Sequence, residues 1–315
     1  MVGVGIVGTG YAATKRAEAL SLDPRAQLLY GAGHDQGKVQ QFAENFGMES
    51  FPAWQNLVSH PQVDLVVICT SNGTHGAIAE TALNQGKHVV VEYPLTLEVE
   101  QGRRLVRLAQ EKQLLLHVEH IELLGGLHQA VKANLPKIGP VFYGRYLTLQ
   151  GQTDVPKNWK YSYEQFGFPF MGALARTTRF IDLFGEVHQV KAQNRYWESD
   201  DSKYFRAFFA QANLTFEGEI EIELTYGKGE VFPNNNHLFE LYGEQGQIIF
   251  EGQTGYLLTS EGKCPIAIPP RQGLFAMETG LVLDHLLEQK PIYTTCDRSL
   301  YALEVADRCR QAAES

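Results

Sequence analysis

An acid and a phenol stand together where an apolar run of the chain ends. Residues 88–92 are mostly valine and predict a buried strand, so Glu92 and Tyr93 fall at its carboxyl end, before Pro94. A carboxylate there could hold a cofactor or a water molecule. A phenol with an ordinary pKa of about 10 stays neutral at pH 7 and can donate a hydrogen bond. The alternatives are structural: Glu92 would cap the next element or join a salt bridge, and Tyr93 would cap the strand.

A glycine-rich turn follows the first apolar run. Residues 2–7 predict a strand, residues 14–21 predict a helix, and Gly8, Gly10 and Ala13 have the spacing GxGxxA. That spacing permits a tight turn, close approach of a pyrophosphate and packing of helix against strand. The phosphates would lie at the helix amino terminus, where free N–H groups and the helix dipole favour an anion. The residues expected to bind the dinucleotide there are Gly8, Thr9, Gly10, Tyr11 and Ala12.

The end of the second predicted strand, residues 27–33, indicates which dinucleotide is bound. An acid normally stands there and accepts hydrogen bonds from the adenosine ribose 2′-OH. Here the strand ends on Gly33, which leaves room for a 2′-phosphate, and His34 and Lys38 bring positive charge nearby. We therefore expect NADPH or NADP+, with NADH used more weakly. The alternative is that Asp35 binds the ribose.

Further apolar runs, at residues 64–69 and 114–118, alternate with helical patterns. Alternating strands and helices predict a parallel, doubly wound sheet whose ligands bind at the carboxyl edge of the strands. The residues after the run at 64–69 are expected to bind cofactor; they are Thr70, Ser71, Asn72 and His75, together with Glu92 from the neighbouring strand. For His75 the open alternative is a histidine at a helix start that bonds local backbone.

The rest of the chain has a different pattern. Residues 140–252 contain alternating stretches such as EIEIELTY, separated by glycine and asparagine turns, and they predict an antiparallel sheet with one apolar and one acidic face. The fold class expected is α/β: a Rossmann domain at residues 1–122 and an α+β domain with a large, mostly antiparallel sheet at 123–315. A helix at 299–313 would pack back on the Rossmann domain. The sheet could form a ligand wall or a dimer surface, so a monomer and a homodimer both remain open.

Composition excludes several classes of partner. A net charge of −9 over 315 residues argues against nucleic-acid binding, which needs clustered lysine and arginine. No run approaches the ~20 apolar residues of a membrane span and the amino terminus has no signal-like segment, so we expect a cytoplasmic protein without membrane association. Neither CxxC nor HExxH spacing occurs, and no metal site is expected. The partner expected is a small molecule.

The chain carries a family resemblance. The phosphate turn, the segment TSNGTHGAIAETALNQGKHVVVE and Pro94 resemble the Gfo/Idh/MocA oxidoreductases. Members of that family usually have Glu-Lys-Pro where this chain has Glu92, Tyr93 and Pro94. They also carry an Asp and a His at positions that, counted back from Asp182, fall here on Ala175 and Arg179. The resemblance implies that residues for oxidising an alcohol are missing, which favours reduction of another substrate.

Within that family the resemblance is to the cyanobacterial biliverdin reductases. It rests on the segments EYPL, LLHVEHIELLGG, QFGFPF, YGKGEVF and SLYALEVAD, which are spread over nearly the whole chain. It implies NADPH-dependent reduction of biliverdin IXα, a linear tetrapyrrole, to bilirubin, with hydride delivered to the central C10 bridge. It also implies that Arg176 is the reductase arginine and that Glu119 and Glu122 line the pigment site.

The chemistry of that reaction suits two arginines. Hydride addition puts electron density on a pyrrole nitrogen, so a nearby cation or proton donor accelerates it. Arg176 and Arg179 are three residues apart and share a helix face if the segment is helical. An arginine, whose pKa exceeds about 12, stabilises charge or relays a proton through water. The catalytic set expected is Arg176, Tyr93, Arg179 and Glu92; the substrate-binding set is Tyr93, Glu119, Glu122, Arg176 and Arg179.

Several alternatives stay open. The arginines could be exposed, and the acids could be a structural pair, with a strand-to-helix junction near His120. The chain could be another oxidoreductase of the family that acts on a sugar or cyclitol, with a different proton carrier. It could also be a regulatory protein that binds NADP(H) without catalysis.

Overall fold

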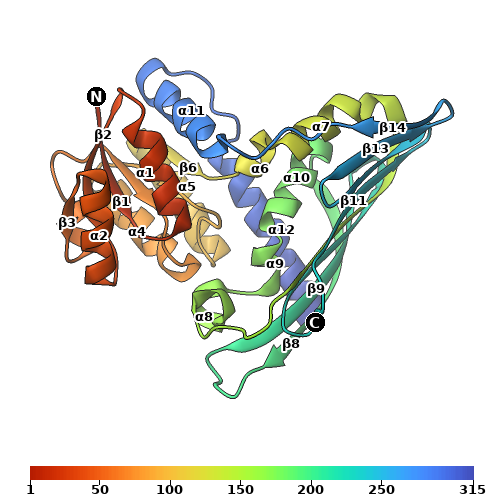
Figure 1. Cartoon of the computed structure of the whole chain (residues 1–315), viewed down its shortest axis with the longest axis horizontal. Helices are drawn as coiled ribbons and strands as arrows, with labels where there is room; N and C mark the ends of the chain where they lie inside the picture. Colours follow the sequence, from red (N-terminus) through yellow and green to blue (C-terminus); the bar gives the residue numbers. More distant parts are fainter. The chain divides into compact units, whose positions relative to one another are not determined.

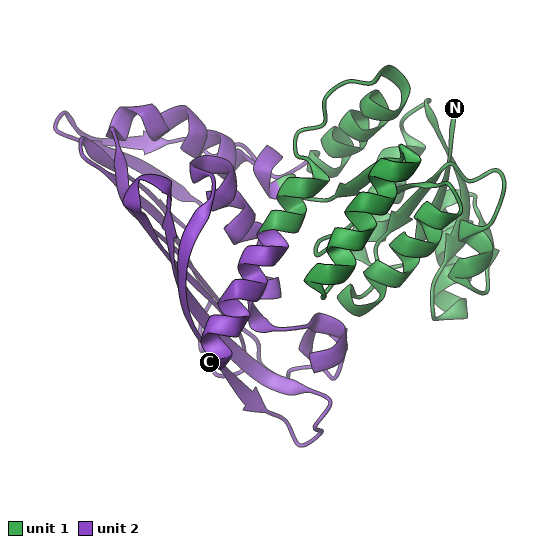
Figure 2. Cartoon of the chain, turned by 180° about the vertical axis from the view of Figure 1, so that it is seen from behind, with its two compact units in different colours: residues 1–121, 273–301 green, residues 122–272, 302–315 purple.

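The computed structural model describes residues 1–315, which form two compact units (Figure 2). The first unit comprises Met1–Ile121 and Gly273–Tyr301, and the second comprises Glu122–Gln272 and Ala302–Ser315. The sequence analysis assigned all residues after 122 to the second domain. The structure differs, because residues 273–301 return to the first unit.

The first unit contains a six-stranded parallel sheet with the order β3-β2-β1-β4-β5-β6 (Figure 1). Its strands are β1 (Val2–Val7), β2 (Ala26–Ala32), β3 (Glu49–Phe51), β4 (Leu65–Ile68), β5 (His88–Val91) and β6 (Leu116–Val118). This order confirms the doubly wound sheet. The sequence pattern did not indicate β3, since it has only three residues and none of them is buried.

Helices cover both faces of this sheet. On one face the buried core includes residues of α1 (Tyr11–Ser21), α2 (Gln36–Phe46) and α11 (Leu274–Glu288). On the other it includes residues of α3 (Trp54–Val58), α4 (Asn72–Asn84) and α5 (Val99–Lys112). In β4, Leu65 and Val67 face the first core while Val66 and Ile68 face the second. Burial on both sides explains why the parallel strands are apolar throughout.

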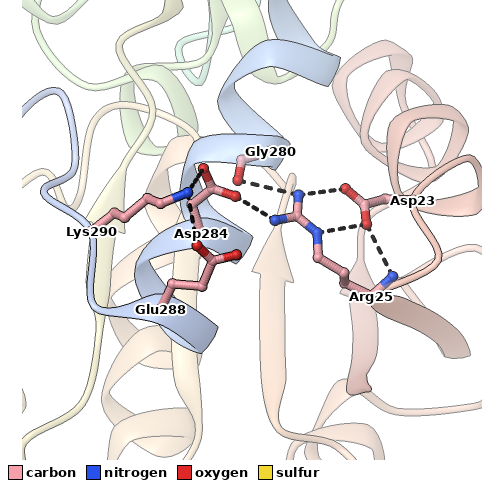
Figure 3. Close-up of polar contacts among 6 residues, drawn as sticks. All are labelled: Asp23, Arg25, Gly280, Asp284, Glu288 and Lys290. Atoms are coloured by element: carbon pink, nitrogen blue, oxygen red, sulfur yellow. Dashed lines mark hydrogen bonds and ion pairs between the residues drawn. The ribbon is translucent and has the colours of Figure 1, made fainter.

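Residues 273–301 are attached to the first unit by apolar and ionic contacts. Val282 and Leu283 of α11 are buried in the sheet core. Arg25, just before β2, bonds Asp23 at 2.7 Å and also pairs with Asp284 of α11 (Figure 3). These three charged side chains are only partly buried, so this group of ion pairs contributes little beside the apolar contacts.

The second unit contains an eight-stranded sheet with the order β14-β13-β12-β11-β7-β10-β9-β8. Its strands are β7 (Val141–Gly151), β8 (Val187–Glu198), β9 (Phe205–Phe216), β10 (Ile220–Gly229), β11 (Asn236–Gly243), β12 (Gly246–Glu251), β13 (Thr254–Thr259) and β14 (Gly262–Ile266). Only the central β7 and β10 pair in parallel, which confirms a large, mostly antiparallel sheet. The sheet continues past residue 252, where the sequence pattern predicted its end.

Helices pack on one face of this sheet. The residues that alternate with glutamate in β10, such as Ile222 and Leu224, are buried, while Glu221 is exposed, as the pattern predicts. Phe180 of α10 (Leu174–Phe184) stacks on Phe239 of β11 with ring centroids 5.7 Å apart. The other helical segments of the unit are α7 (Gly126–Asn134), η1 (Leu135–Ile138), η2 (Trp159–Tyr161), α8 (Tyr163–Phe166), α9 (Pro169–Gly172) and η3 (Glu217–Glu219).

Two helices contain residues of both units. The short α6 (Ile121–Leu124) follows β6 after Glu119 and His120, which confirms the expected strand-to-helix junction. The long α12 (Cys296–Glu314) covers the helix expected at 299–313. Its first turn belongs to the first unit, whereas Arg308 donates to the carbonyl oxygen of Val187 in β8 at 2.8 Å. No helix in the structure has the length and apolarity needed to cross a membrane.

Candidate functional site

The turn after β1 has the geometry of a phosphate-binding turn. Gly8 has φ +119°, and a Cβ added to it would lie 2.2 Å from the carbonyl oxygen of Cys69, so only glycine fits. Gly10 precedes the first turn of α1, and a Cβ added to it would meet no atom within 4 Å. No side chain caps α1, so its first N–H groups remain available to an anion. These residues fit the pyrophosphate of a dinucleotide.

The end of β2 presents a glycine in the position of the usual acid. A Cβ added to Gly33 would lie 3.0 Å from a methyl group of Val39, so the backbone here is closely covered. The Asp35 carboxylate caps α2 by accepting from the Lys38 N–H at 3.1 Å, and this bond lowers the pKa of Asp35. The Asp35 carboxylate thus serves as a helix cap, and the choice between Gly33 and Asp35 as the residue beside the ribose stays a prediction.

Residues after β4 form the neighbouring part of this edge. Ser71 precedes α4, whose first residue is Asn72, and Thr70 accepts a 2.7 Å hydrogen bond from the Thr74 hydroxyl. His75 is buried, with its ring nitrogens 2.7 Å from the carbonyl oxygen of Pro94 and 3.1 Å from that of Thr70. The ring therefore joins the loops after β4 and β5. The bond to Thr70 fits the alternative of a histidine that bonds local backbone, whereas Pro94 is 19 residues away in the sequence.

Glu92 belongs to a buried ionic cluster that the sequence analysis missed. Arg16 of α1 is almost fully buried, and its Nε lies 3.0 Å from Glu92 Oε1. Its Nη1 lies 2.5 Å from Glu278 Oε2 of α11. Arg16 could have been noticed, because it shares the apolar face of α1 with Ala13, Ala17 and Leu20. The place of Glu92 in a salt bridge was one of the stated alternatives.

Glu278 is the most strongly bonded acid of the cluster. It accepts a hydrogen bond from His117 Nε2 at 2.8 Å and another from the Tyr293 hydroxyl. Burial alone would raise the pKa of Glu278, but the Arg16 charge and these hydrogen bonds hold it well below its usual range. Glu278 is therefore a permanent anion that fixes Arg16.

Glu119 has the most strongly raised pKa of the three acids in the cluster. It is buried, and its Oε1 accepts from the Ile121 N–H at 2.7 Å. Burial, followed by the charges of Glu92 and Glu278, raises its pKa well above the usual range. Burial also raises the pKa of Glu92, although Arg16 opposes this. The pKa of Glu119 is raised further than that of Glu92, so Glu119 is the first of the three acids to take up a proton as pH falls.

Tyr93 lies just beyond β5 and is half-buried. Its ring stacks on that of His120, with centroids 6.1 Å apart and an interplanar angle of 10°. The His120 Nε2 lies 3.0 Å from the Ser299 hydroxyl, and burial lowers the pKa of His120 to about 3. The Tyr93 phenol therefore stands against a neutral aromatic ring. The Tyr93–Pro94 peptide bond is cis.

The second unit holds the arginines. Arg176 of α10 is half-buried; its Nε donates to the Thr148 hydroxyl at 3.1 Å and its Nη1 to the Gly172 carbonyl at 3.3 Å. The guanidinium carbon lies 4.8 Å from the ring centroid of Tyr226 and 5.7 Å from that of Tyr146. Strands β7 and β10 and the end of α9 thus fix the direction of this cation.

Arg179 has different surroundings. It is only 1% exposed, so the alternative of a pair of exposed arginines is wrong. Its Nη2 lies 3.3 Å from Glu122 Oε2, and the other Glu122 oxygen pairs with Arg271 at 2.5 Å. Arg176 and Arg179 both lie over the Tyr146 ring, as their spacing on one helix face predicts. Arg179 is suited to holding Glu122, whereas Arg176 is the more accessible cation.

The first unit therefore brings together the phosphate turn, the loop after β4, Glu92, Tyr93 and Glu119. The second brings together Glu122, Arg176 and Arg179. As binding or catalytic residues these remain predictions.

Family models match both units. Residues 2–120 match the oxidoreductase family with an NAD-binding Rossmann fold, and residues 132–315 match the C-terminal alpha/beta domain of that oxidoreductase family. The chain therefore belongs to the Gfo/Idh/MocA oxidoreductase family, as its sequence resemblance indicates.

The individual proteins similar to this chain include several biliverdin reductases. The crystal structure of biliverdin reductase from Synechocystis, in complex with biliverdin and NADP+, is similar with a TM-score of 0.97 and 51% identity, covering 100% of this chain and 99% of that chain. Biliverdin reductase A of Homo sapiens is 33% identical over 139 residues, 44% of each chain. The enzyme of Mus musculus is 30% identical over 190 residues, 60% of each chain. The chain thus matches less than two thirds of the length of these two curated relatives.

Proposed function

We propose that this chain catalyses the NADPH-dependent reduction of biliverdin IXα to bilirubin. The observation that carries the proposal is the similarity to the Synechocystis reductase, which extends over the whole chain at 51% identity. The missing Lys and His of alcohol oxidation support it, because Tyr93 and Arg179 stand in their places.

Residues of the first unit would hold the cofactor. The turn at Gly8 and Gly10, with the uncapped start of α1, suits the pyrophosphate, and Gly33 places no carboxylate where it would repel a 2′-phosphate. Bound NADPH supplies a hydride, that is, two electrons and one hydrogen nucleus. Glu92, held by Arg16, would orient the nicotinamide or a water molecule at the end of β5.

Residues of the second unit would assist the reduction of biliverdin. The hydride forms a new C–H bond at C10, the conjugated double bond there is lost, and a pyrrole nitrogen takes one proton. Biliverdin, NADPH and one proton therefore give bilirubin and NADP+. Arg176 would stabilise the negative charge that develops on the nitrogen, and the proton would come through water held by the arginine or from the Tyr93 phenol.

Arg176→Ala tests this role. We expect kcat for biliverdin to fall about 10²–10³-fold, the usual effect of removing a group that stabilises transition-state charge. The Kd of NADPH should be unchanged, because the expected cofactor residues lie in the other unit. Arg176→Lys should recover part of the rate. Turnover is followed by loss of the green absorption of biliverdin.

The matched control is Arg195→Ala, which removes an exposed arginine whose guanidinium carbon lies 4.7 Å from the ring centroid of Trp197. It should leave kcat unchanged. Unchanged turnover of Arg176→Ala would remove Arg176 from the mechanism.

A further inference from the structure

Lys228 of β10 is a cation without an acidic partner. Its Nζ lies 4.2 Å from the ring centroid of Tyr161 and 5.9 Å from that of Phe166. The side chain is half-buried, and no acidic group is among those that shift its pKa. Burial, and secondly the charge of Lys160, lowers the pKa of Lys228 to about 8. Its ammonium group therefore lacks the compensation that buried charges usually have.

Lys228 shares a sheet face with the Arg176 site. Tyr226, whose ring lies under the Arg176 guanidinium, is two residues before Lys228 on β10, so both side chains point to the same side of the sheet. Two residues of a strand span about 6.6 Å. On the neighbouring β7, Gln150 pairs with Lys228, and Gln150 Oε1 accepts from the Tyr226 hydroxyl at 3.4 Å.

We propose that Lys228, in its aromatic surround of Tyr161 and Phe166, binds a carboxylate of the substrate. This inference rests on the proposed function, in which the carboxylate is a propionate of the linear tetrapyrrole. It adds to the site a binding residue for which the sequence analysis gave no role.

The chemistry of the pigment fits this placement. The two propionates of biliverdin IXα are attached to the pyrrole rings on either side of the C10 bridge. A cation that binds a propionate must therefore lie close to Arg176, the cation expected beside C10. Lys228 meets this condition, because it is two residues from Tyr226, whose ring contacts Arg176. The aromatic rings offer flat apolar surface to the pyrroles.

The electrostatics also favour an anion. Lys160 of η2 is the one charged group that shifts the pKa of Lys228, and it lowers that pKa. Two like charges beside aromatic rings repel each other, and an arriving carboxylate relieves this repulsion. It would also raise the Lys228 pKa toward its ordinary value.

The test compares biliverdin with its dimethyl ester, in which both propionates are uncharged. For Lys228→Met we expect the Kd of biliverdin, from absorbance titration with NADP+ present, to rise about ten- to hundredfold, the loss typical of a charge-assisted hydrogen bond. The Kd of the diester should change less than threefold. Lys228→Arg should restore most of the affinity for the diacid.

Lys263→Met is the matched control, since Lys263 is an exposed lysine 3.6 Å from the ring centroid of Tyr256 and should have no effect. Circular dichroism checks that the variants are folded. An equal loss of affinity for diacid and diester, or no loss for either, overturns the role of Lys228. Failure of the unaltered protein to reduce biliverdin would instead overturn the proposed function, and the two results are separable.

Discussion

Arg16 links three parts of the first unit that are far apart in the sequence. It contacts Glu92 at the end of β5 and Glu278 in α11, and its guanidinium carbon lies 4.9 Å from the ring centroid of Phe275. Removal of one partner of a buried ion pair typically costs about 3–5 kcal/mol, because the remaining charge is left buried. The cluster therefore contributes rigidity at the edge where the cofactor is expected.

Glu119 gives this cluster a measurable pH dependence. Its pKa is raised in the folded chain, whereas in the unfolded chain it ionises near the usual 4.3 or so. Above that pH the folded state binds more protons than the unfolded state, so the contribution of Glu119 to stability falls as pH rises toward its folded pKa. Glutamine cannot ionise, and its amide oxygen can still accept from Ile121.

We therefore expect Glu119→Gln to raise the Tm at pH 7.5 by several degrees, since about 1 kcal/mol shifts Tm by about 1–2 °C in a protein of 315 residues. Near pH 4 the Tm values of variant and unaltered protein should converge. Circular dichroism during heating measures both. Glu111→Gln, an exposed position on α5, is the control without an effect. A Tm of the variant below that of the unaltered protein at pH 7.5 would contradict the raised pKa of Glu119.

Helix α1 contributes to the expected cofactor site at two points, its first turn and Arg16. Its uncapped start presents N–H groups beside Gly10, and Arg16, in its second turn, is buried against Glu92. One helix thus connects the expected phosphate site with the strand end that carries the site acid. The glycines before it differ: Gly8 is required by the backbone, whereas the backbone at Gly10 tolerates a side chain.

This difference predicts the effect of Gly10→Ala. The fold should be unaffected, because the Gly10 backbone is in the extended region and an added methyl group meets no atom. The Kd of NADPH, measured by fluorescence titration, should rise at least about tenfold, because the methyl group takes the space of the pyrophosphate.

Gly280→Ala, in the middle of α11, adds a methyl group away from the turn and is the control with unchanged affinity. An unchanged Kd for Gly10→Ala would place the phosphates elsewhere.

Across the whole molecule, local sequence patterns predict the two sheets but not the contacts between distant segments. Strands that are buried on both faces have continuous apolar sequences, as in β4. A strand buried on one face alternates polar and apolar residues, as in β10, and these two patterns made both sheets predictable. The return of α11 was not, because its attachment depends on contacts such as that of Arg16 with Glu278, 262 residues away in the sequence. A local sequence pattern does not indicate a contact between residues so far apart in the sequence.

The candidate site was predictable to the same degree. The turn at Gly8 has a sequence signature because backbone geometry demands it, and the family resemblance pointed to Arg176. The raised pKa of Glu119 and the lowered pKa of Lys228 arise from burial and from neighbours on other elements. These properties require the folded structure.

The most direct test follows the hydride. NADPH labelled with deuterium at C4 of the nicotinamide, on one face and then on the other, is incubated with the protein and biliverdin, and the product is analysed by mass spectrometry and NMR. We predict that the green colour disappears and that one of the two labelled cofactors yields bilirubin with a single deuterium at C10. Unchanged pigment together with oxidation of a polyol by NADP+, or deuterium at another carbon, would contradict the proposed reaction.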